Sequence, residues 1–175
     1  MRILFAFVLC LALAISPWSS AKSPKPTKNA QYVDYAVSAL IKQFGDGLSV
    51  SYPQQRQILW GKVFDFDSEP RADDAIAFFA IEGFGGGNDH AEYLAFFVAV
   101  SPTPAGKTLP YRLEAVTQIG GRGWRTFDWD TAVIRPNEIT VSGKQLGEKD
   151  GFCCPSVPIA VTFRVVKGSI VEVQK

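Results

Sequence analysis

Two apolar segments of the chain have no polar face. Residues 75–81 (AIAFFAI) and 93–100 (YLAFFVAV) are apolar at both odd and even positions. Strands that are covered on both sides have this pattern. The residues between the two segments include four glycines, which favours a turn over a helix. The pattern therefore predicts a central β-hairpin at the core of the fold.

A single amphipathic helix is predicted at residues 30–44. Apolar side chains recur there at spacings of three and four, as on one face of an α-helix. Asn29 can cap the first turn, and Gly45 can end the last one. We expect this helix to cover one face of the central hairpin.

The remaining segments predict short strands and turns. Residues 111–115 and 159–165 alternate between apolar and polar positions, as half-buried strands do. Lys167 and Gly168 are predicted to form the turn of a C-terminal hairpin. Further strands are predicted at residues 48–51, 58–64, 132–134, 138–142 and 170–173, with a turn-rich aromatic segment at residues 120–130 and a polar loop at residues 143–158. The predicted fold is an α+β domain: an antiparallel β-sheet of about eight short strands with one N-terminal amphipathic helix packed on a face.

The N-terminus has the three parts of a secretory signal peptide. A positive start at Arg2 is followed by an apolar run over residues 3–15 and by small residues up to Ala21. Cleavage after Ala21 leaves a Pro- and Lys-rich spacer at residues 22–28, expected to be disordered, and a single domain at residues 29–175. We therefore expect a bacterial protein that is periplasmic or secreted, with no membrane span after signal cleavage.

The charge of the chain is nearly balanced, with 18 basic and 17 acidic residues. Domains that bind nucleic acid usually carry a strong basic excess on one face. Nucleic acid is therefore not expected as a partner.

Carboxylates alternate in the loop that enters the central hairpin. Asp65, Asp67, Glu69 and Asp73 occupy positions 1, 3, 5 and 9 of this loop, a spacing that lets oxygen ligands converge on one calcium ion. Pro70 stands at position 6, where calcium loops turn sharply at a glycine. A calcium site and an ordinary solvated acidic turn both stay open at this point, and no other cofactor is expected.

Cys153 and Cys154 are the two cysteines left after cleavage, and they are neighbours. In an oxidising compartment they can close a vicinal disulfide, remain thiols or each pair with another molecule. The chain has no CxxC motif, and no Lys, Arg or His adjoins the two cysteines to lower a thiol pKa. A structural disulfide is therefore favoured over catalytic redox chemistry.

Aromatic and basic residues cluster at residues 122–130. Trp and Arg are enriched at binding hot spots, and Trp also stacks on sugars and cations. Arg122, Trp124, Arg125 and Trp129 are therefore the candidate binding residues. The alternative is that Trp124 and Trp129 cover an open end of the sheet while the charged residues pair locally.

No catalytic set stands out in the sequence. His90 is the only histidine, and the chain has no nucleophile motif such as GxSxG. Glu82 and Glu92 lie at predicted strand ends, where solvated carboxylates are routine. An enzyme would need these acids to converge with Asp128 and Asp130 in one cleft. The sequence therefore favours a protein that is not an enzyme, and no catalytic residue is assigned.

Four features occur together in order along the chain. They are an acidic loop at residues 65–74, the glycine-broken hairpin at 75–100, the string IGGRGWR at 119–125 and the string CCP at 153–155. In this arrangement the chain resembles, over residues 58–173, a group of uncharacterised bacterial secreted proteins and lipoproteins that includes the mycobacterial LppP/LprE-like lipoproteins. It lacks the lipobox of those lipoproteins. The resemblance implies an exported α+β domain and brings no known activity or catalytic residue.

These observations lead to one expected function and several alternatives. We expect a non-enzymatic binding module of the bacterial envelope or the extracellular medium, with a protein or a cell-wall glycan as its partner. The alternatives are a periplasmic inhibitor or immunity-type protein, a hydrolase with an acidic site, and a calcium-stabilised structural module.

Overall fold

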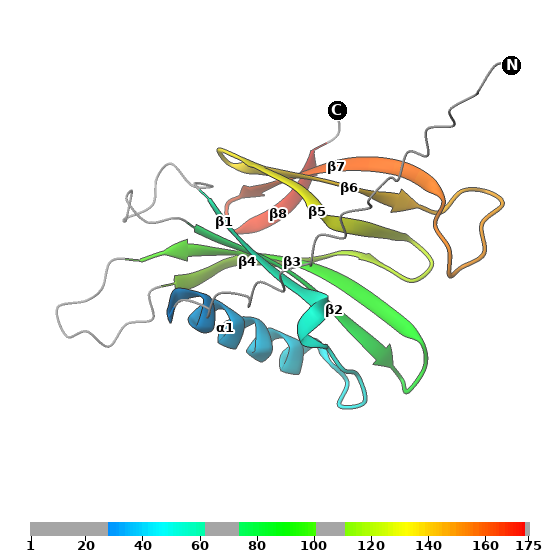
Figure 1. Cartoon of the computed structure of the whole chain (residues 1–175), viewed down its shortest axis with the longest axis horizontal. Coiled ribbons are helices and arrows are strands. Elements are labelled where there is room, and N and C mark those ends of the chain that lie inside the picture. The colour runs from blue at the N-terminus through cyan, green and yellow to red at the C-terminus, as the bar shows by residue number, and fades with distance from the viewer. Residues whose placement is uncertain (1–27, 62–73, 101–110, 174–175) are drawn as a thin grey trace, which may run out of the picture.

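The computed structural model describes residues 28–61, 74–100 and 111–173. Its strands form one eight-stranded antiparallel sheet, in which each strand neighbours the next one in the chain (Figure 1). Within the described ranges the sheet is accompanied by a single α-helix, so the α+β class fits the structure. The elements are α1 (Lys28–Phe44), the short 3₁₀ helix η1 (Pro53–Gln55), β1 (Arg56–Gly61), β2 (Asp74–Phe84), β3 (Asp89–Ala99), β4 (Tyr111–Gly121), β5 (Arg125–Arg135), β6 (Glu138–Gln145), β7 (Val157–Val166) and β8 (Ser169–Val173).

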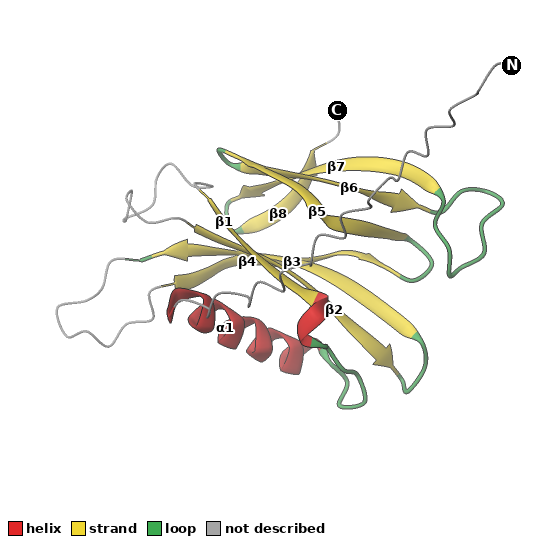
Figure 2. Cartoon of the chain, viewed as in Figure 1, coloured by secondary structure: helices red, strands yellow, loops and turns green. Residues whose placement is uncertain are grey.

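The sheet divides into two halves between β4 and β5. These two strands pair only where Gly121 faces Arg125, whereas β3 and β4 pair along almost their whole length. Figure 2 shows α1 on one side of β1–β4 and the strands β5–β8 on the other side. The molecule therefore has three layers, and β1–β4 form the middle one.

Both faces of the β2–β3 hairpin are buried, which confirms the prediction of a doubly covered hairpin. On the face toward α1, Phe79 packs in a cluster with Val33 and Val37 of the helix. On the face toward β5–β8, Phe78 and Phe96 pack in a second cluster with side chains of β6 and β7. Complete burial of a large apolar side chain contributes about 1.5–3 kcal/mol, so this hairpin carries much of the stabilising burial.

Two secondary-structure predictions are wrong. Residues 48–51 form no strand; Val50 makes one isolated bridge to Glu82, and its side chain stays exposed beside that of Leu48. Most of the segment predicted to be turn-rich, residues 120–130, is strand, because the turn between β4 and β5 takes only residues 122–124. Strands β2 to β5 each have 11 residues and are longer than the predicted short strands.

The turn between β2 and β3 depends on glycine and on one aspartate. Gly83, Gly85 and Gly86 have φ angles of 83°, 63° and 71°, a region that other residues rarely adopt. The Asp46 carboxylate, in the loop after α1, accepts hydrogen bonds from the N–H groups of Gly85 at 2.6 Å and Leu48 at 3.0 Å. These backbone hydrogen bonds lower the pKa of Asp46 to about 2. The turn of the hairpin is thereby fixed to the loop that follows the helix.

Candidate functional site

The face of the β2–β3 hairpin toward β5–β8, called here the inward face, changes from apolar to polar along its length. Alternate side chains of a strand point to the same face, so the even-numbered residues share it. Ala80 is paired with Glu92 across the two strands, and Glu82 with His90. The inward face therefore runs from Ile76 and Phe78 to Ala80 and Glu82 on β2, and from Phe96 and Leu94 to Glu92 and His90 on β3.

A cleft of about 540 Å³ opens at the polar end of this face. It lies between η1 and the start of β1, the end of β2, the start of β3 and the first half of β5. We call it the acidic cleft because its lining includes Glu82, Glu92, Asp128 and Asp130 together with His90. These are the four acids that, by the sequence argument, an enzymatic site would need in one place.

Glu92 is the buried acid of the cleft, with only 5% of its surface exposed. Its Oε2 accepts a hydrogen bond from the backbone N–H of Phe127 at 3.0 Å, and its Oε1 accepts one from the Thr126 hydroxyl. Burial raises the pKa of Glu92, and the hydrogen bonds from Thr126 and Phe127 partly oppose that rise. The prediction of a solvated carboxylate at a strand end is wrong for Glu92, because β5 covers this end of β3.

Gly120 of β4 has no side chain, and this lets the backbone of β4 lie close to the carboxylate of Glu92 and to β5. A Cβ atom at Gly120 would lie 2.7 Å from the carbonyl oxygen of Arg125 and 3.2 Å from Oε2 of Glu92. The first distance is too short for a Cβ atom, and the second is tighter than most Cβ contacts. Gly120 therefore permits the close approach of β3, β4 and β5 at the buried end of the cleft.

The basic side chains of the cleft are already engaged with other groups. His90 Nε2 lies 3.9 Å from Oε1 of Glu92, and the electrostatic interaction with His90 partly opposes the burial that raises the pKa of Glu92. Arg56 turns away toward α1, where its Nη1 donates to Ser38 Oγ at 2.9 Å and to Asp34 Oδ1 at 3.3 Å. The acids of the cleft consequently outnumber the cations that could balance them.

One wall of the cleft is aromatic. Trp129 stacks on Phe78, with 5.8 Å between ring centroids, and packs against the core cluster between the two half-sheets. Its indole nitrogen is buried and contributes to lowering the pKa of Glu92, although it does not reach hydrogen-bond geometry. Beside it, Gln57 Nε2 donates to Asp130 Oδ1 at 2.9 Å and so connects β1 to β5. An aromatic wall next to carboxylates suits a ligand with both polar and apolar parts.

The four candidate binding residues of the sequence lie in different places. Trp129 lines the acidic cleft, whereas Arg122 lies at the turn between β4 and β5 and donates to Asn88 and, at 3.1 Å, to Asp89. Trp124 is 44% exposed at the same turn. The four residues therefore do not form one continuous binding surface.

Arg125 has the contacts of a structural residue. It is 7% exposed, its Nε donates to the carbonyl oxygen of Ile119 at 2.6 Å, and its Nη2 lies 2.8 Å from Oε2 of Glu172. The guanidinium carbon lies 4.1 Å from the centroid of the Trp124 ring, which covers it from solvent. These contacts join β4, β5 and β8, and they match the alternative in which the charged residues of this segment pair locally.

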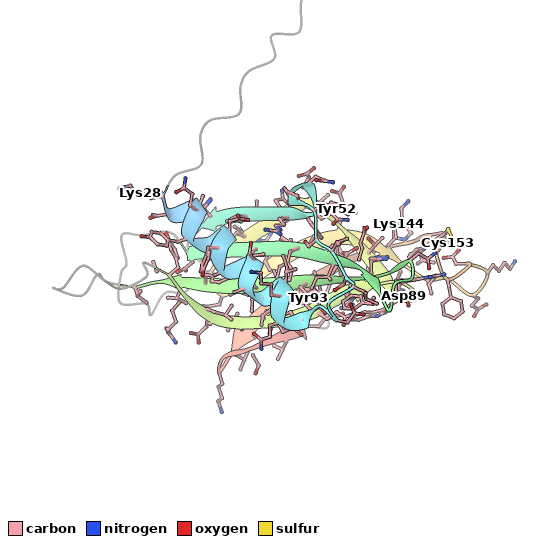
Figure 3. All side chains as sticks on the ribbon, turned by 90° about the horizontal axis from the view of Figure 1, so that it is seen from below. Lys28, Tyr52, Asp89, Tyr93, Lys144 and Cys153 are labelled. Carbon is pink, nitrogen blue, oxygen red and sulfur yellow. A yellow bond between two sulfur atoms is a disulfide. The ribbon has the colours of Figure 1, made fainter. Side chains whose placement is uncertain are left out.

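A disulfide joins Cys153 to Cys154 in the loop between β6 and β7. Figure 3 shows Cys153 at the same end of the molecule as Asp89 and Lys144, away from Lys28 at the start of α1. The loop contacts the turn between β4 and β5, because Gly123 N–H donates to the carbonyl oxygen of Phe152 at 3.0 Å.

The predicted calcium ligands Asp65, Asp67, Glu69 and Asp73 lie outside the described residues, as do the predicted signal peptide and nearly all of the spacer. The calcium site therefore stays a prediction. Among the residues that the structure does describe, no three His, Cys, Asp or Glu side chains converge as ligands for one metal ion.

Comparison of the chain with protein-family models, with curated proteins and with solved structures found no match. Within the described part of the chain, no helix combines the length and the apolar character needed to cross a membrane.

Proposed function

We propose that the chain is an exported binding module whose ligand carries an amine and sits in the acidic cleft. The observation that carries this proposal is the excess of carboxylates in one concave site. A cleft lined by one sign of charge, with low-dielectric walls, concentrates the electrostatic field and attracts ligands of the opposite sign. A protonated amine is a compact organic cation that can donate up to three hydrogen bonds to such carboxylates.

The distribution of ion pairs supports a cationic ligand. In the described ranges, no ion pair involves Glu82, Asp128 or Asp130. Arg56, at the rim, is paired with Asp34 of α1 instead. A ligand cation would therefore meet carboxylates that have no protein cation to displace, and it would gain interaction energy without breaking an existing ion pair.

The shape of the lining favours an organic cation over a metal ion. The four carboxylates are spread over β2, β3 and β5 and do not converge on one point among the described residues. The aromatic wall at Trp129 adds an apolar surface, which an amino sugar or a lysine side chain can cover. Either source, a glycan or a basic peptide, presents the same amine chemistry to the cleft.

Calorimetric titration with matched pairs of ligands tests the proposal. One pair is a glucosamine tetramer and its fully N-acetylated form; the other is a lysine-containing peptide and the same peptide acetylated at lysine. We expect binding by an amine form and at least tenfold weaker binding by its acetylated partner, because acetylation removes the charge. Binding of the glucosamine tetramer would indicate a glycan ligand, and binding of the lysine-containing peptide would indicate a protein ligand.

Variants locate the site within the same experiment. Glu82→Gln combined with Asp128→Asn is expected to weaken amine binding about tenfold or more, since two charges near the ligand are removed. Glu148→Gln is the matched control, because Glu148 is exposed and lies outside the cleft lining. Equal binding of the charged and acetylated ligands, or equal losses in the two variants, would overturn the proposal.

A second candidate function, hydrolysis of a glycosidic bond, is favoured by Glu92. Such reactions use one protonated carboxylic acid and one ionised carboxylate near the same bond. Burial raises the pKa of Glu92, as a general acid requires, while Asp128 lies in the same cleft. Incubation with oligosaccharides in ¹⁸O-labelled water tests this candidate: a hydrolase would release labelled products, and Glu92→Gln would abolish their release.

A further inference from the structure

We propose that the Cys153–Cys154 disulfide is a redox-active site that oxidises dithiols of exported partner molecules, with Cys154 as the attacked sulfur and Cys153 as the leaving thiolate. His90 lines both the acidic cleft and the pocket beside Cys153, whereas Arg122 and Cys153 line only the latter. The redox activity does not require ligand binding in the cleft, so either proposal can fail without the other.

The disulfide lies where a partner thiol can reach it. Cys153 and Cys154 are both exposed, as are Gly151 and Phe152 before them. Exposed disulfides are the ones that exchange with thiols, whereas structural disulfides are usually protected from reductants. This disulfide is therefore more accessible to thiols than a buried structural disulfide would be.

The fold brings two basic side chains from distant parts of the sequence to Cys153. A small pocket of about 120 Å³ is lined by Cys153 together with His90 from the start of β3 and Arg122 from the turn between β4 and β5. Cationic groups lower the pKa of a thiol by stabilising the thiolate, and a thiol of lower pKa is the better leaving group. Neither residue adjoins the cysteines in the sequence, so only the fold places them in one pocket with Cys153.

Carboxylates also face these basic groups and limit their effect. Arg122 Nη1 lies 3.1 Å from Oδ1 of Asp89, and His90 Nε2 lies 3.9 Å from Oε1 of Glu92. The hydrogen bond to Asp89 holds Arg122 in place beside the pocket. Cys154 does not line this pocket, so the pocket distinguishes the two sulfurs and identifies Cys153 as the better leaving group.

The loop has anchors that do not depend on the disulfide. The carboxylate of Asp150 accepts hydrogen bonds from Gly147 N–H and Ser156 N–H, both at 2.8 Å, and from the Ser156 hydroxyl at 2.8 Å. These hydrogen bonds lower the pKa of Asp150, so the carboxylate stays ionised. Because the carbonyl oxygen of Phe152 also accepts a hydrogen bond from Gly123 N–H, the reduced loop is expected to keep Cys153 in one pocket with Arg122 and His90.

The exchange balances as a two-electron transfer between the disulfide and a dithiol. A thiolate of the partner attacks Sγ of Cys154, the Cys153–Cys154 bond breaks, and Cys153 leaves as a thiolate. The second partner thiol, once deprotonated, attacks the partner sulfur of the mixed disulfide and releases Cys154 as a thiolate. The partner is oxidised to a disulfide, and the protons that it loses restore Cys153 and Cys154 as thiols.

Reduction of the full chain by dithiothreitol tests the activity, with free thiols counted by alkylation and mass spectrometry. We expect reduction at low millimolar dithiothreitol without denaturant, and reoxidation by oxidised glutathione. We also expect Arg122→Gln to slow the reduction about three- to tenfold, because the leaving thiolate loses a stabilising cation. Lys149→Gln is the matched control, since this exposed lysine belongs to the same loop and does not line the pocket.

A second measurement separates the chemical effect from a folding effect. In the reduced chain, the pH dependence of iodoacetamide labelling is expected to give Cys153 a lower pKa than Cys154, and Arg122→Gln is expected to remove that difference. A disulfide that resists dithiothreitol in the folded chain would overturn the proposal. So would variants that exchange at the wild-type rate with two thiols of equal pKa.

Discussion

The two ends of the inward face of the β2–β3 hairpin have opposite chemistry on one pair of strands. At one end, Phe78 and Phe96 are fully buried in the core between the two half-sheets. At the other end, Glu82, His90 and Glu92 line the acidic cleft. The same strand pairing that aligns the apolar side chains also aligns the polar ones, so the core fixes the geometry of the cleft.

The difference also shows where the fold can hold a polar site. The polar end of the hairpin lies beside the point where β4 pairs with β5, because Glu92 is paired with Gly120 and the neighbouring Gly121 is paired with Arg125. Apolar side chains fill the space between the half-sheets away from this junction, while the carboxylates line the cleft beside it. Substitutions at the apolar end should change stability, and substitutions at the polar end should change binding.

The largest expected effect is at the apolar end. Phe78→Ala removes a fully buried ring and leaves a cavity beneath Trp129, and it should lower the free energy of unfolding by about 3–5 kcal/mol. Urea denaturation measures this loss. Glu82→Ala, at the polar end of the same strand, should change the free energy of unfolding by less than about 1 kcal/mol while it weakens amine binding. Similar losses of stability in the two variants would contradict the expectation that the apolar end determines stability and the polar end determines binding.

A smaller effect is expected where the two ends meet. Ala80 lies opposite Glu92 and lines the cleft with the smallest side chain that a chiral residue can have. Ala80→Leu should fill the buried part of the cleft, weaken ligand binding about tenfold and lower the free energy of unfolding by about 1–3 kcal/mol. Ala80→Ser is the control that keeps the volume nearly unchanged. Unchanged calorimetric affinity in Ala80→Leu would show that the ligand does not enter this part.

The smallest expected effect is the pH dependence that Glu92 gives to the free energy of unfolding. Burial raises the pKa of Glu92 above its ordinary value of 4.5, so the folded state binds a proton more tightly than the unfolded state. Its contribution to stability is therefore complete below pH 4.5 and is lost as pH rises through the raised pKa. Glu92→Gln cannot titrate and can still accept a hydrogen bond from Phe127 N–H.

Chemical denaturation from pH 4 to pH 8 measures this prediction. The free energy of unfolding of the wild type, relative to that of Glu92→Gln, should decrease as pH rises above 4.5 and then become constant. A difference that does not change over this range would mean that Glu92 is as well solvated as an exposed glutamate.

The elements with strong periodicity could be predicted from the sequence. The hairpin was predictable because both of its faces are apolar, and α1 because its apolar residues recur at helical spacing. Residues 48–51 misled the prediction because two apolar side chains, Leu48 and Val50, are exposed in a loop. Local alternation alone does not reveal whether a neighbouring strand is available to pair.

The candidate site was harder to predict than the fold because it depends on pairing between distant strands. Glu82 and Asp128 are far apart in the chain and meet only because β5 folds over the hairpin. Glu92 is buried under β5, to which it is hydrogen-bonded through Phe127 N–H. Arg125 is buried where it contacts Ile119 of β4 and Glu172 of β8. The sequence could identify the acids that an acidic site would need, but it could not predict that they line one cleft.

Mapping of ligand contacts by NMR tests the central claim most directly. In ¹H–¹⁵N spectra of the full chain titrated with the glucosamine tetramer and with the lysine-containing peptide, the account predicts that at least one of them shifts the amide signals of residues 80–92 and 126–130. The corresponding acetylated ligand should leave them in place. Shifts confined to other surfaces, such as the exposed tyrosines of α1, or no shifts with either amine ligand, would contradict the assignment of the acidic cleft as the binding site.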